Sequence, residues 1–160
     1  MGDDQETLRA LERLYRDKYP SFLRLALAIL GQRDAAAEAV QEGFVRALRA
    51  RGSLRDPERL EPWVWKTVLN VARAHRARPS SELFPAPEGE AGNDHAEEWP
   101  ELRAAIAALP SRQREVLFLR HYADLDYQQI AGALGISRGT VAATLTQTHA
   151  ALRRTLEVPR

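Results

Sequence analysis

A stretch near the middle of the chain, residues 79–99, combines proline, glycine, serine and acidic residues with few large apolar side chains. Residues 79–101 hold seven Asp or Glu and no Lys or Arg. Such a composition buries too little apolar surface to offset the entropy of ordering, so we expect a flexible acidic linker. The linker divides the chain into two blocks, residues 1–78 and 100–160, each with a modest core.

Both blocks repeat their apolar residues with a helical period, and neither shows the alternation of a strand. In the first block, one helical pattern runs to Gly31, with a break or a fresh start at Pro20. A second helix ends near Gly52 and is expected to bury Val40, Phe44 and Leu48. A third starts near Trp63 and runs to about Arg78. The sequence predicts an all-α protein with two small helical domains.

The second block predicts a short helix that buries Leu102, Ala105, Ile106 and Leu109, followed by three further helices. Three polar residues stand where the side chain of an N-cap would accept a backbone hydrogen bond: Ser111, Asp126 and Ser137. The last helix is expected to bury a stripe made of Val141, Leu145, Leu152 and Leu156.

Four positions in this block follow the pattern of a helix-turn-helix: Ala131, Gly135, Ile136 and Val141. The small Ala131 lets two helices approach, and Gly135 supplies the positive φ that the turn needs. Ile136 and Val141 fill the angle between the helices. The alternative is a plain helical hairpin that only stabilises the domain.

Several classes of function lack support in the sequence. There are no cysteines, which excludes disulfides and Cys-based zinc sites and favours a reducing cytoplasm. The four histidines are scattered without ligand spacing, and neither a phosphate-binding glycine loop nor a nucleophile motif is present. No apolar run is long enough to span a bilayer. We therefore expect a cytoplasmic protein that is not an enzyme, with no cofactor, no metal and no membrane insertion.

The charge pattern permits a nucleic-acid partner without requiring one. The net charge of +1 combines about +4 over residues 1–78, −7 over residues 79–101 and +4 over residues 102–160, counting Lys and Arg against Asp and Glu. Four polar residues share one side of the predicted third helix, opposite Val64, Val68 and Val71: Lys66, Asn70, Arg73 and Arg76. Cations of this kind hold a nucleic-acid backbone, while asparagine offers a donor and an acceptor to a base.

Three aromatic residues at or near this helix have two interpretations each. Trp63 and Trp65 either stack on bases or pack in the core, and we favour packing for Trp63. His75 continues the apolar stripe, so we expect it to be packed or capped rather than to contact DNA.

Three long stretches resemble one family, the bacterial RNA polymerase sigma factors of the extracytoplasmic-function type. The first two, in order, are "YRDKYPSFLRLALAILGQRDAAAEAVQEGFVRALRA" and "WVWKTVLNVARAHRAR", and the third is "ALPSRQREVLFLRHYADLDYQQIAGALGISRGTV". The resemblance implies a protein that binds core RNA polymerase, recognises −10 and −35 promoter elements, melts the −10 duplex and directs transcription initiation. Promoter DNA is then its second partner, and an anti-sigma factor is a further partner that the family allows.

The resemblance also implies sites. In the family, the second helix binds a coiled coil of the polymerase, which here corresponds to Asp34, Glu38, Gln41, Glu42 and Arg49. A merely solvated face would explain these charges equally well. The third helix holds the −10 element, and its matching residues are Trp63, Lys66, Asn70, Arg73 and Arg76. The loop at residues 54–62 corresponds to the place where the family holds a flipped −10 base.

The last helix departs from the family pattern, because no Lys or Arg follows Arg138 until Arg153. Its expected −35 residues are Arg138, Thr140, Ala142, Ala143, Thr146 and Gln147. Gln147 suits adenine, and the methyl groups of Ala and Thr suit thymine. The helix dipole beside Arg138, cations on earlier helices and tethering by the polymerase would compensate for the missing cations. The rival explanation is a domain that has drifted towards protein contacts.

Two other functions remain open on the sequence alone. One is a transcription regulator that binds duplex DNA through its helix-turn-helix without polymerase tethering. The other treats both blocks as protein-interaction modules, which the polar stripe of the third helix argues against.

Overall fold

The structure is a computed structural model that describes residues 2–77 and 99–157. These residues form helices and short turns without a strand among them, which confirms the predicted all-α class. The helices are α1 (Gly2–Leu30), α2 (Arg33–Ala50), α3 (Leu60–Ala77), α4 (Pro100–Ala107), α5 (Ser111–His121), α6 (Tyr127–Leu134) and α7 (Arg138–Leu156), with 3-10 turns at Arg51–Ser53 and Pro57–Arg59. Except for Trp99, the expected linker at residues 79–99 lies outside the described residues, as does His95.

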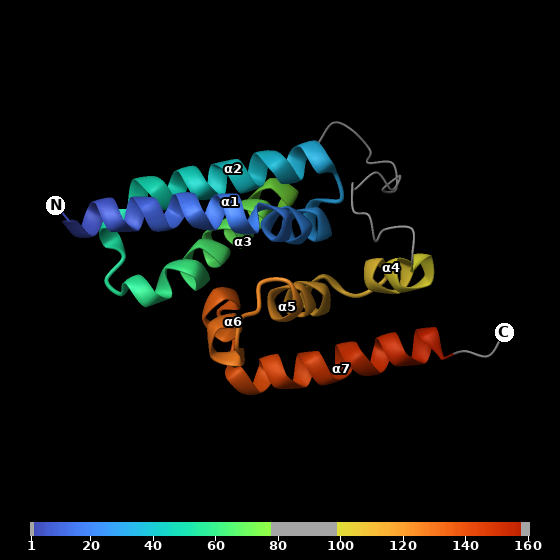
Figure 1. The fold of residues 1–160 in the computed structure, drawn as a ribbon. Coiled ribbons are helices and arrows are strands. Elements are labelled where there is room, and N and C mark those ends of the chain that lie inside the picture. Colours follow the sequence, from blue (N-terminus) through green and yellow to red (C-terminus); the bar gives the residue numbers. More distant parts are fainter. Residues whose placement is uncertain (1, 78–98, 158–160) are drawn as a thin grey trace.

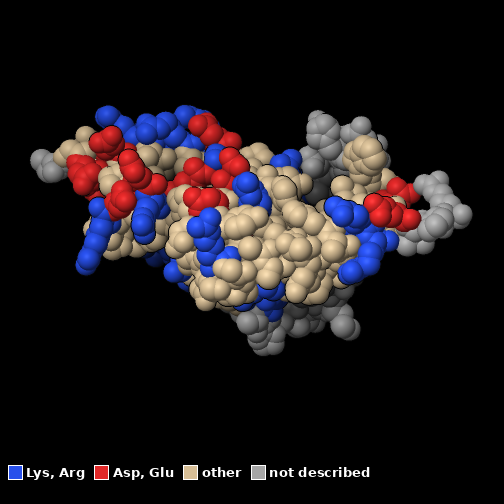
Figure 2. Space-filling view, turned by 90° about the horizontal axis from the view of Figure 1, so that it is seen from below, with Lys and Arg blue, Asp and Glu red and all other residues tan. Residues whose placement is uncertain are grey.

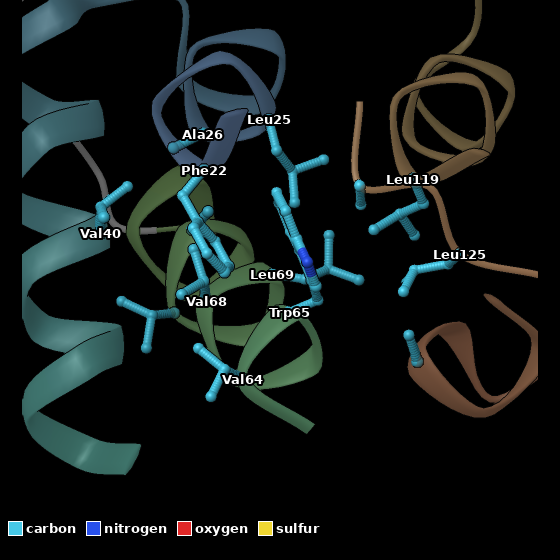
Figure 3. Close-up of a cluster of buried hydrophobic side chains, with 14 of the residues drawn as sticks. Phe22, Leu25, Ala26, Val40, Val64, Trp65, Val68, Leu69, Leu119 and Leu125 are labelled. Atoms are coloured by element: carbon cyan, nitrogen blue, oxygen red, sulfur yellow. The ribbon is translucent and has the colours of Figure 1, made fainter. Parts of the chain in front are cut away.

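The first three helices form a bundle around an aromatic centre. The indole of Trp65 stacks on the ring of Phe22, with 3.7 Å between ring centroids, and Phe22 meets Phe44 edge-on at 5.0 Å. Trp65 and Phe22 are fully buried, and each contributes about 1.5–3 kcal/mol by leaving water. Figure 3 shows Trp65 on α3 reaching into this centre beside Phe22. The interpretation of Trp65 as a base-stacking residue is therefore wrong.

Two helix boundaries in the first block differ from those expected. Helix α1 continues through Pro20 as one helix, so the predicted break there is wrong. Proline removes one backbone hydrogen bond and bends a helix, and the buried Phe22 and Leu25 hold the following turns against the core. Helix α3 begins at Leu60, three residues before Trp63, because Pro62 lies in its first turn, where a missing N–H costs little.

The turns of the second block are set by their caps. The Asp126 carboxylate accepts a hydrogen bond from Gln129 N at 2.8 Å, and the Gln129 side chain accepts one from Asp126 N at 2.9 Å. Gly135 ends α6 with φ of 67°, as the helix-turn-helix pattern predicts, and Ser137 Oγ accepts from Thr140 N at 3.0 Å. The expected cap at Ser111 is wrong, since Ser111 is already the first residue of α5 and Pro110 precedes it.

Two of the predicted buried stripes end sooner than expected. On α2, Val40 and Phe44 are buried but Leu48 is 37% exposed. On α7, Val141 and Leu145 are buried, Leu152 is half-buried and Leu156 is 46% exposed. On α2 the buried side continues through Gly43 and Ala47 instead of Leu48, and on α7 the last residue of the buried side is Thr148.

The two groups of helices pack against each other, with α6 against α3 and α5 against α1. Figure 1 shows α1–α3 as the upper group, α4–α7 as the lower group, and α7 along the edge far from the first bundle. Leu119 and Leu125 belong to the same buried cluster as Trp65 and Leu69, and Figure 3 shows them facing these residues. The guanidinium of Arg24 lies 5.1 Å from the centre of the Tyr122 ring. No helix within the described residues is long and apolar enough to cross a membrane.

Candidate nucleic-acid interface

Helix α3 presents its polar stripe at the surface. Its opposite side carries the fully buried Val64, Val68 and Val71, which fix the rotation of the helix. Of the five residues expected to hold −10 DNA, three are exposed: Lys66, Asn70 and Arg76. The structure therefore leaves two cations and one amide of this face available to a nucleic acid.

Trp63 differs from its neighbour Trp65. It is half-buried and packs against the edge of the core, while the hydroxyl of Thr67 donates to its backbone carbonyl at 2.9 Å. It also lines a cleft of about 510 Å³. Trp63 therefore packs against the core and also lines the cleft.

The cleft lies between the two halves of the molecule. One wall comes from the loop before α3 and the start of α3, and includes the cations Arg55, Arg59 and Lys66. The other wall is α6, which contributes Gln128 and Gln129. A cleft with cations and a tryptophan on one wall suits a nucleotide, because it offers charge for a phosphate and a ring for a base.

Arg73 is the one member of the α3 set that is already engaged. Its Nε donates to Glu115 Oε1 at 3.2 Å and its Nη2 donates to Glu115 Oε2 at 2.5 Å. The Arg73 side chain is 26% exposed, while that of Glu115, on α5, is 4% exposed. Sequence reasoning missed Glu115, whose only signal was a charged residue between apolar positions of a predicted helix.

Helix α7 presents a surface almost free of charge. Five of its six expected −35 residues are exposed and Ala142 is half-buried. Thr144 and Thr148 face inward, and their hydroxyls donate to the carbonyls of Thr140 and Thr144. Figure 2, which views the molecule from the α7 side, shows a broad uncharged area with Lys and Arg at its edges. This surface suits contacts with base edges and offers little grip on phosphates.

The cations expected to flank α7 are only partly available. Arg112 is exposed, but Arg114 donates to the carbonyl of Ala107 at 3.3 Å. Arg120 donates to the carbonyl of Leu125 at 3.4 Å. His121 Nε2 lies 3.3 Å from His149 Nε2 of α7, and burial, then the charges of His149 and Arg120, lower the pKa of His121.

The third surface is the outer face of α2. Asp34, Glu38, Gln41 and Arg49 are exposed there. Glu42 is half-buried and bonded at both oxygens: Arg46 donates at 2.6 Å, and Nε2 of His75 donates at 2.5 Å.

The hydrogen bond from His75 lowers the pKa of Glu42, although burial opposes the effect, and Arg46 lowers it further. The His75 side chain is only 8% exposed, as expected for a packed histidine. The exposed Val45 and Leu48 add an apolar element to this face that the sequence did not suggest.

Two family models match the chain in the order of its two halves. Sigma-70 region 2 matches residues 14–81, and Sigma-70, region 4 matches residues 100–152. The chain is also 27% identical over 146 residues to the ECF RNA polymerase sigma factor EcfG of Rhodopseudomonas palustris, covering 87% of this chain and 81% of that protein. The chain belongs to the extracytoplasmic-function sigma factors. This sigma factor therefore takes part in promoter recognition and transcription initiation with RNA polymerase.

Two further relatives show how much of the chain is shared. RNA polymerase sigma factor SigV of Bacillus subtilis is 27% identical over 150 residues, covering 91% of this chain and 90% of that protein. The probable RNA polymerase sigma factor RfaY of Xanthomonas campestris is 33% identical over 146 residues. That match covers 82% of this sigma factor but only 36% of the Xanthomonas protein.

Two solved structures share the fold of this sigma factor. One is the sigma factor RpoE of Bartonella quintana in complex with the anti-sigma factor NepR, with a TM-score of 0.71 and 18% identity over 95% of this chain and 99% of that one. The other is CnrH in complex with the cytosolic domain of CnrY, with a TM-score of 0.73 and 21% identity over 98% of this chain and 93% of that one. The likeness extends over both halves of the molecule.

Proposed function

We propose that three separate faces of this sigma factor carry its function. The outer face of α2 binds core RNA polymerase through Asp34, Glu38, Gln41, Glu42 and Arg49, with Val45 and Leu48 as apolar contacts. The polar side of α3 holds the −10 element through Trp63, Lys66, Asn70, Arg73 and Arg76. Helix α7 reads the −35 element through Arg138, Thr140, Ala142, Ala143, Thr146 and Gln147.

The domain boundaries belong to the same proposal. Residues 1–78 form the domain that binds polymerase and the −10 element, and residues 100–160 form the −35 domain. Residues 79–99 connect them as an acidic linker. This sigma factor has no catalytic role of its own, works in the cytoplasm and is open to control by an anti-sigma factor.

The observation that carries the proposal is the uncharged surface of α7. Each phosphate contact adds about 0.9 to the salt slope of duplex binding, so a reader with few cations grips DNA weakly by itself. A second attachment through polymerase and the −10 element raises its effective concentration at the promoter. This observation favours a sigma factor over a regulator that binds duplex DNA alone.

The proposal is tested by transcription in vitro with purified core polymerase on a random promoter library. We expect initiation from a defined subset of promoters that share two elements. A gel shift of the selected duplex, with and without core polymerase, separates the two functions. Tight binding by the isolated chain would favour the independent regulator.

A further inference from the structure

Glu115 is a buried carboxylate whose two oxygens both bind Arg73. Only 3% of the residue is exposed, and the bonds to Arg73 span 3.2 and 2.5 Å. The two residues come from different halves of the molecule, α5 and α3. Helix α7 packs against α5 but has no Lys or Arg between Arg138 and Arg153, so the middle of α7 supplies no cation to Glu115.

The geometry of this pair matches that of an arginine bound to a phosphate. A guanidinium offers two parallel N–H donors, and carboxylates and phosphates accept them in the same forked arrangement. The pair occupies the forked edge formed by Nε and Nη2 of Arg73, and the donors that remain do not offer this edge to a second anion. Arg73 therefore cannot hold Glu115 and a promoter phosphate with the same two nitrogens.

The surroundings of the pair point in the same direction. Helix α6 packs against α3, and Gln128 and Gln129 form the wall of the cleft opposite Trp63 and Lys66. In this arrangement the second half of the molecule stands beside the face of α3 that is proposed to hold the −10 strand. The packed arrangement of the two halves thus engages Arg73 and leaves Trp63 and Lys66 on the wall of the cleft opposite α6.

We propose that Glu115 is an intramolecular competitor of promoter DNA for Arg73. The buried carboxylate takes the place of a −10 phosphate while the two halves are packed together, and α5 must leave α3 before Arg73 binds DNA. This inference rests on the proposed −10 role of Arg73. It assigns to Glu115 a function in promoter binding although Glu115 touches no DNA.

The test uses the full chain without polymerase. Glu115→Gln keeps the shape of the side chain but removes its charge and one of its two acceptors. The matched control is Glu157→Gln, which removes one negative charge from the exposed end of α7. The probe is a fluorescein-labelled mixed-sequence single-stranded DNA of about 12 nucleotides, followed by anisotropy over a range of salt concentrations.

We expect Glu115→Gln to bind the probe several-fold more tightly than the wild type and the control. Its salt slope should be steeper by about 0.7, the value of one added phosphate contact on a single strand. In the Arg73→Ala background, Glu115→Gln should bring no such gain. An equal gain in both backgrounds, or no gain in either, would overturn the competition.

A second measurement separates this inference from the proposed function. The chain has no cysteines, so Glu12→Cys and Arg154→Cys give two defined dye positions on exposed residues of α1 and α7. Glu115→Gln should lower energy transfer between the dyes as the halves separate. A fall in transfer without any change in DNA binding would contradict the role of Arg73 at the −10 element, although it would show that Glu115 holds the halves together. Unchanged transfer would show that Glu115 does not hold the halves together.

Discussion

Arg73 and Arg76 lie three residues apart on α3, yet the structure gives them different surroundings. Arg76 is exposed, whereas Arg73 is bonded to a carboxylate 42 residues further along the chain. Helical periodicity placed both on the polar side of α3, because periodicity reports only the direction of a side chain. The residue that a side chain contacts depends on an element that is distant in sequence, which for Arg73 is α5.

Gly43 shows the same limit for packing. A Cβ atom at this position would lie 2.7 Å from Val68 Cγ2 and 3.0 Å from Val68 Cα. Gly43→Ala should therefore lower the free energy of unfolding by about 1–2 kcal/mol, since the clash exceeds the gain in helix propensity. Urea unfolding followed by circular dichroism measures this change.

Gly132→Ala is the control, because a Cβ there meets nothing within 4 Å. It should raise the free energy of unfolding by about 0.5–1 kcal/mol. A Gly43→Ala variant as stable as the wild type would show that α2 and α3 separate easily at this point.

His121 makes the stability of the second half depend on pH. Burial and the nearby His149 and Arg120 lower its pKa below the ordinary value of 6.5, so the unfolded chain takes up its proton first. The stabilisation is complete above pH 6.5 and is lost as the pH falls through the lowered pKa of the folded state. Urea unfolding between pH 8 and pH 5 should show this loss, and His121→Gln should reduce it.

Glu42 makes the free energy of unfolding depend on pH in a lower pH range than His121 does. Its pKa is lowered from 4.5, so its stabilisation is lost only as the pH falls below that value.

A variant His121→Gln with the same pH profile as the wild type above pH 5 would contradict the assignment to His121.

At the scale of elements, the caps of α6 and α7 and the turn between these helices followed local rules, while the cap at Ser111 and the ends of apolar stripes did not. Asp126, Gly135 and Ser137 have the roles that their positions indicate, since a cap depends on residues two or three positions away. Leu48 and Leu156 continue the apolar period of buried residues but are exposed, whereas Ala47 beside Leu48 is fully buried. The extent of burial is set by the neighbours of a helix.

The caps give a direct comparison. Asp126→Ala should lower the free energy of unfolding by about 0.5–2 kcal/mol, because it leaves the backbone N–H of Gln129 without its acceptor. Ser111→Ala should change it little, since Ser111 makes no capping bond. Thermal unfolding of both variants measures the difference, and equal losses would contradict the structural distinction.

Helix α7 leads to a prediction about promoter selection. Gln147→Ala and Thr146→Ala should shift the −35 preference of polymerase-dependent initiation, because they remove contacts with base edges. Each shift should be at most about 3 kcal/mol. Their salt dependence should stay close to that of the wild type, because neither residue is a cation. Sequencing of the initiating promoters measures the preference, with the exposed Thr155→Ala as control. If neither variant changes it, α7 does not read bases.

At the scale of the whole molecule, the two helical blocks share one buried cluster. Leu119 and Leu125 of the second half and Leu69 and Trp65 of the first half belong to it. Apolar residues that pack across the boundary couple the unfolding of the two halves. The two halves therefore form one packed body, joined by the contacts of α3 with α6 and of α1 with α5.

The coupling is measurable. With Trp99 of the second half replaced by Phe, the fluorescence of Trp63 and Trp65 reports on the first half and circular dichroism reports on all helices, so the two urea transitions of the otherwise wild-type chain should coincide. Glu115→Gln, which weakens the contact between the halves, should move the transitions apart. Two separate transitions in the wild type would show that the halves unfold independently.

Four features could be predicted from the order of the amino acids alone: the helical class, the order of the elements, the helix-turn-helix with its caps, and the polar stripe of α3. These features follow from backbone propensities and from the period of apolar residues, which act over a few positions of the chain. Three other features become visible only when the helices are packed: Trp65 lies in the core, His75 binds Glu42, and Glu115 binds Arg73. These contacts depend on which helix surfaces pack together. The free energy of that packing comes from residues that are dozens of positions apart in the chain.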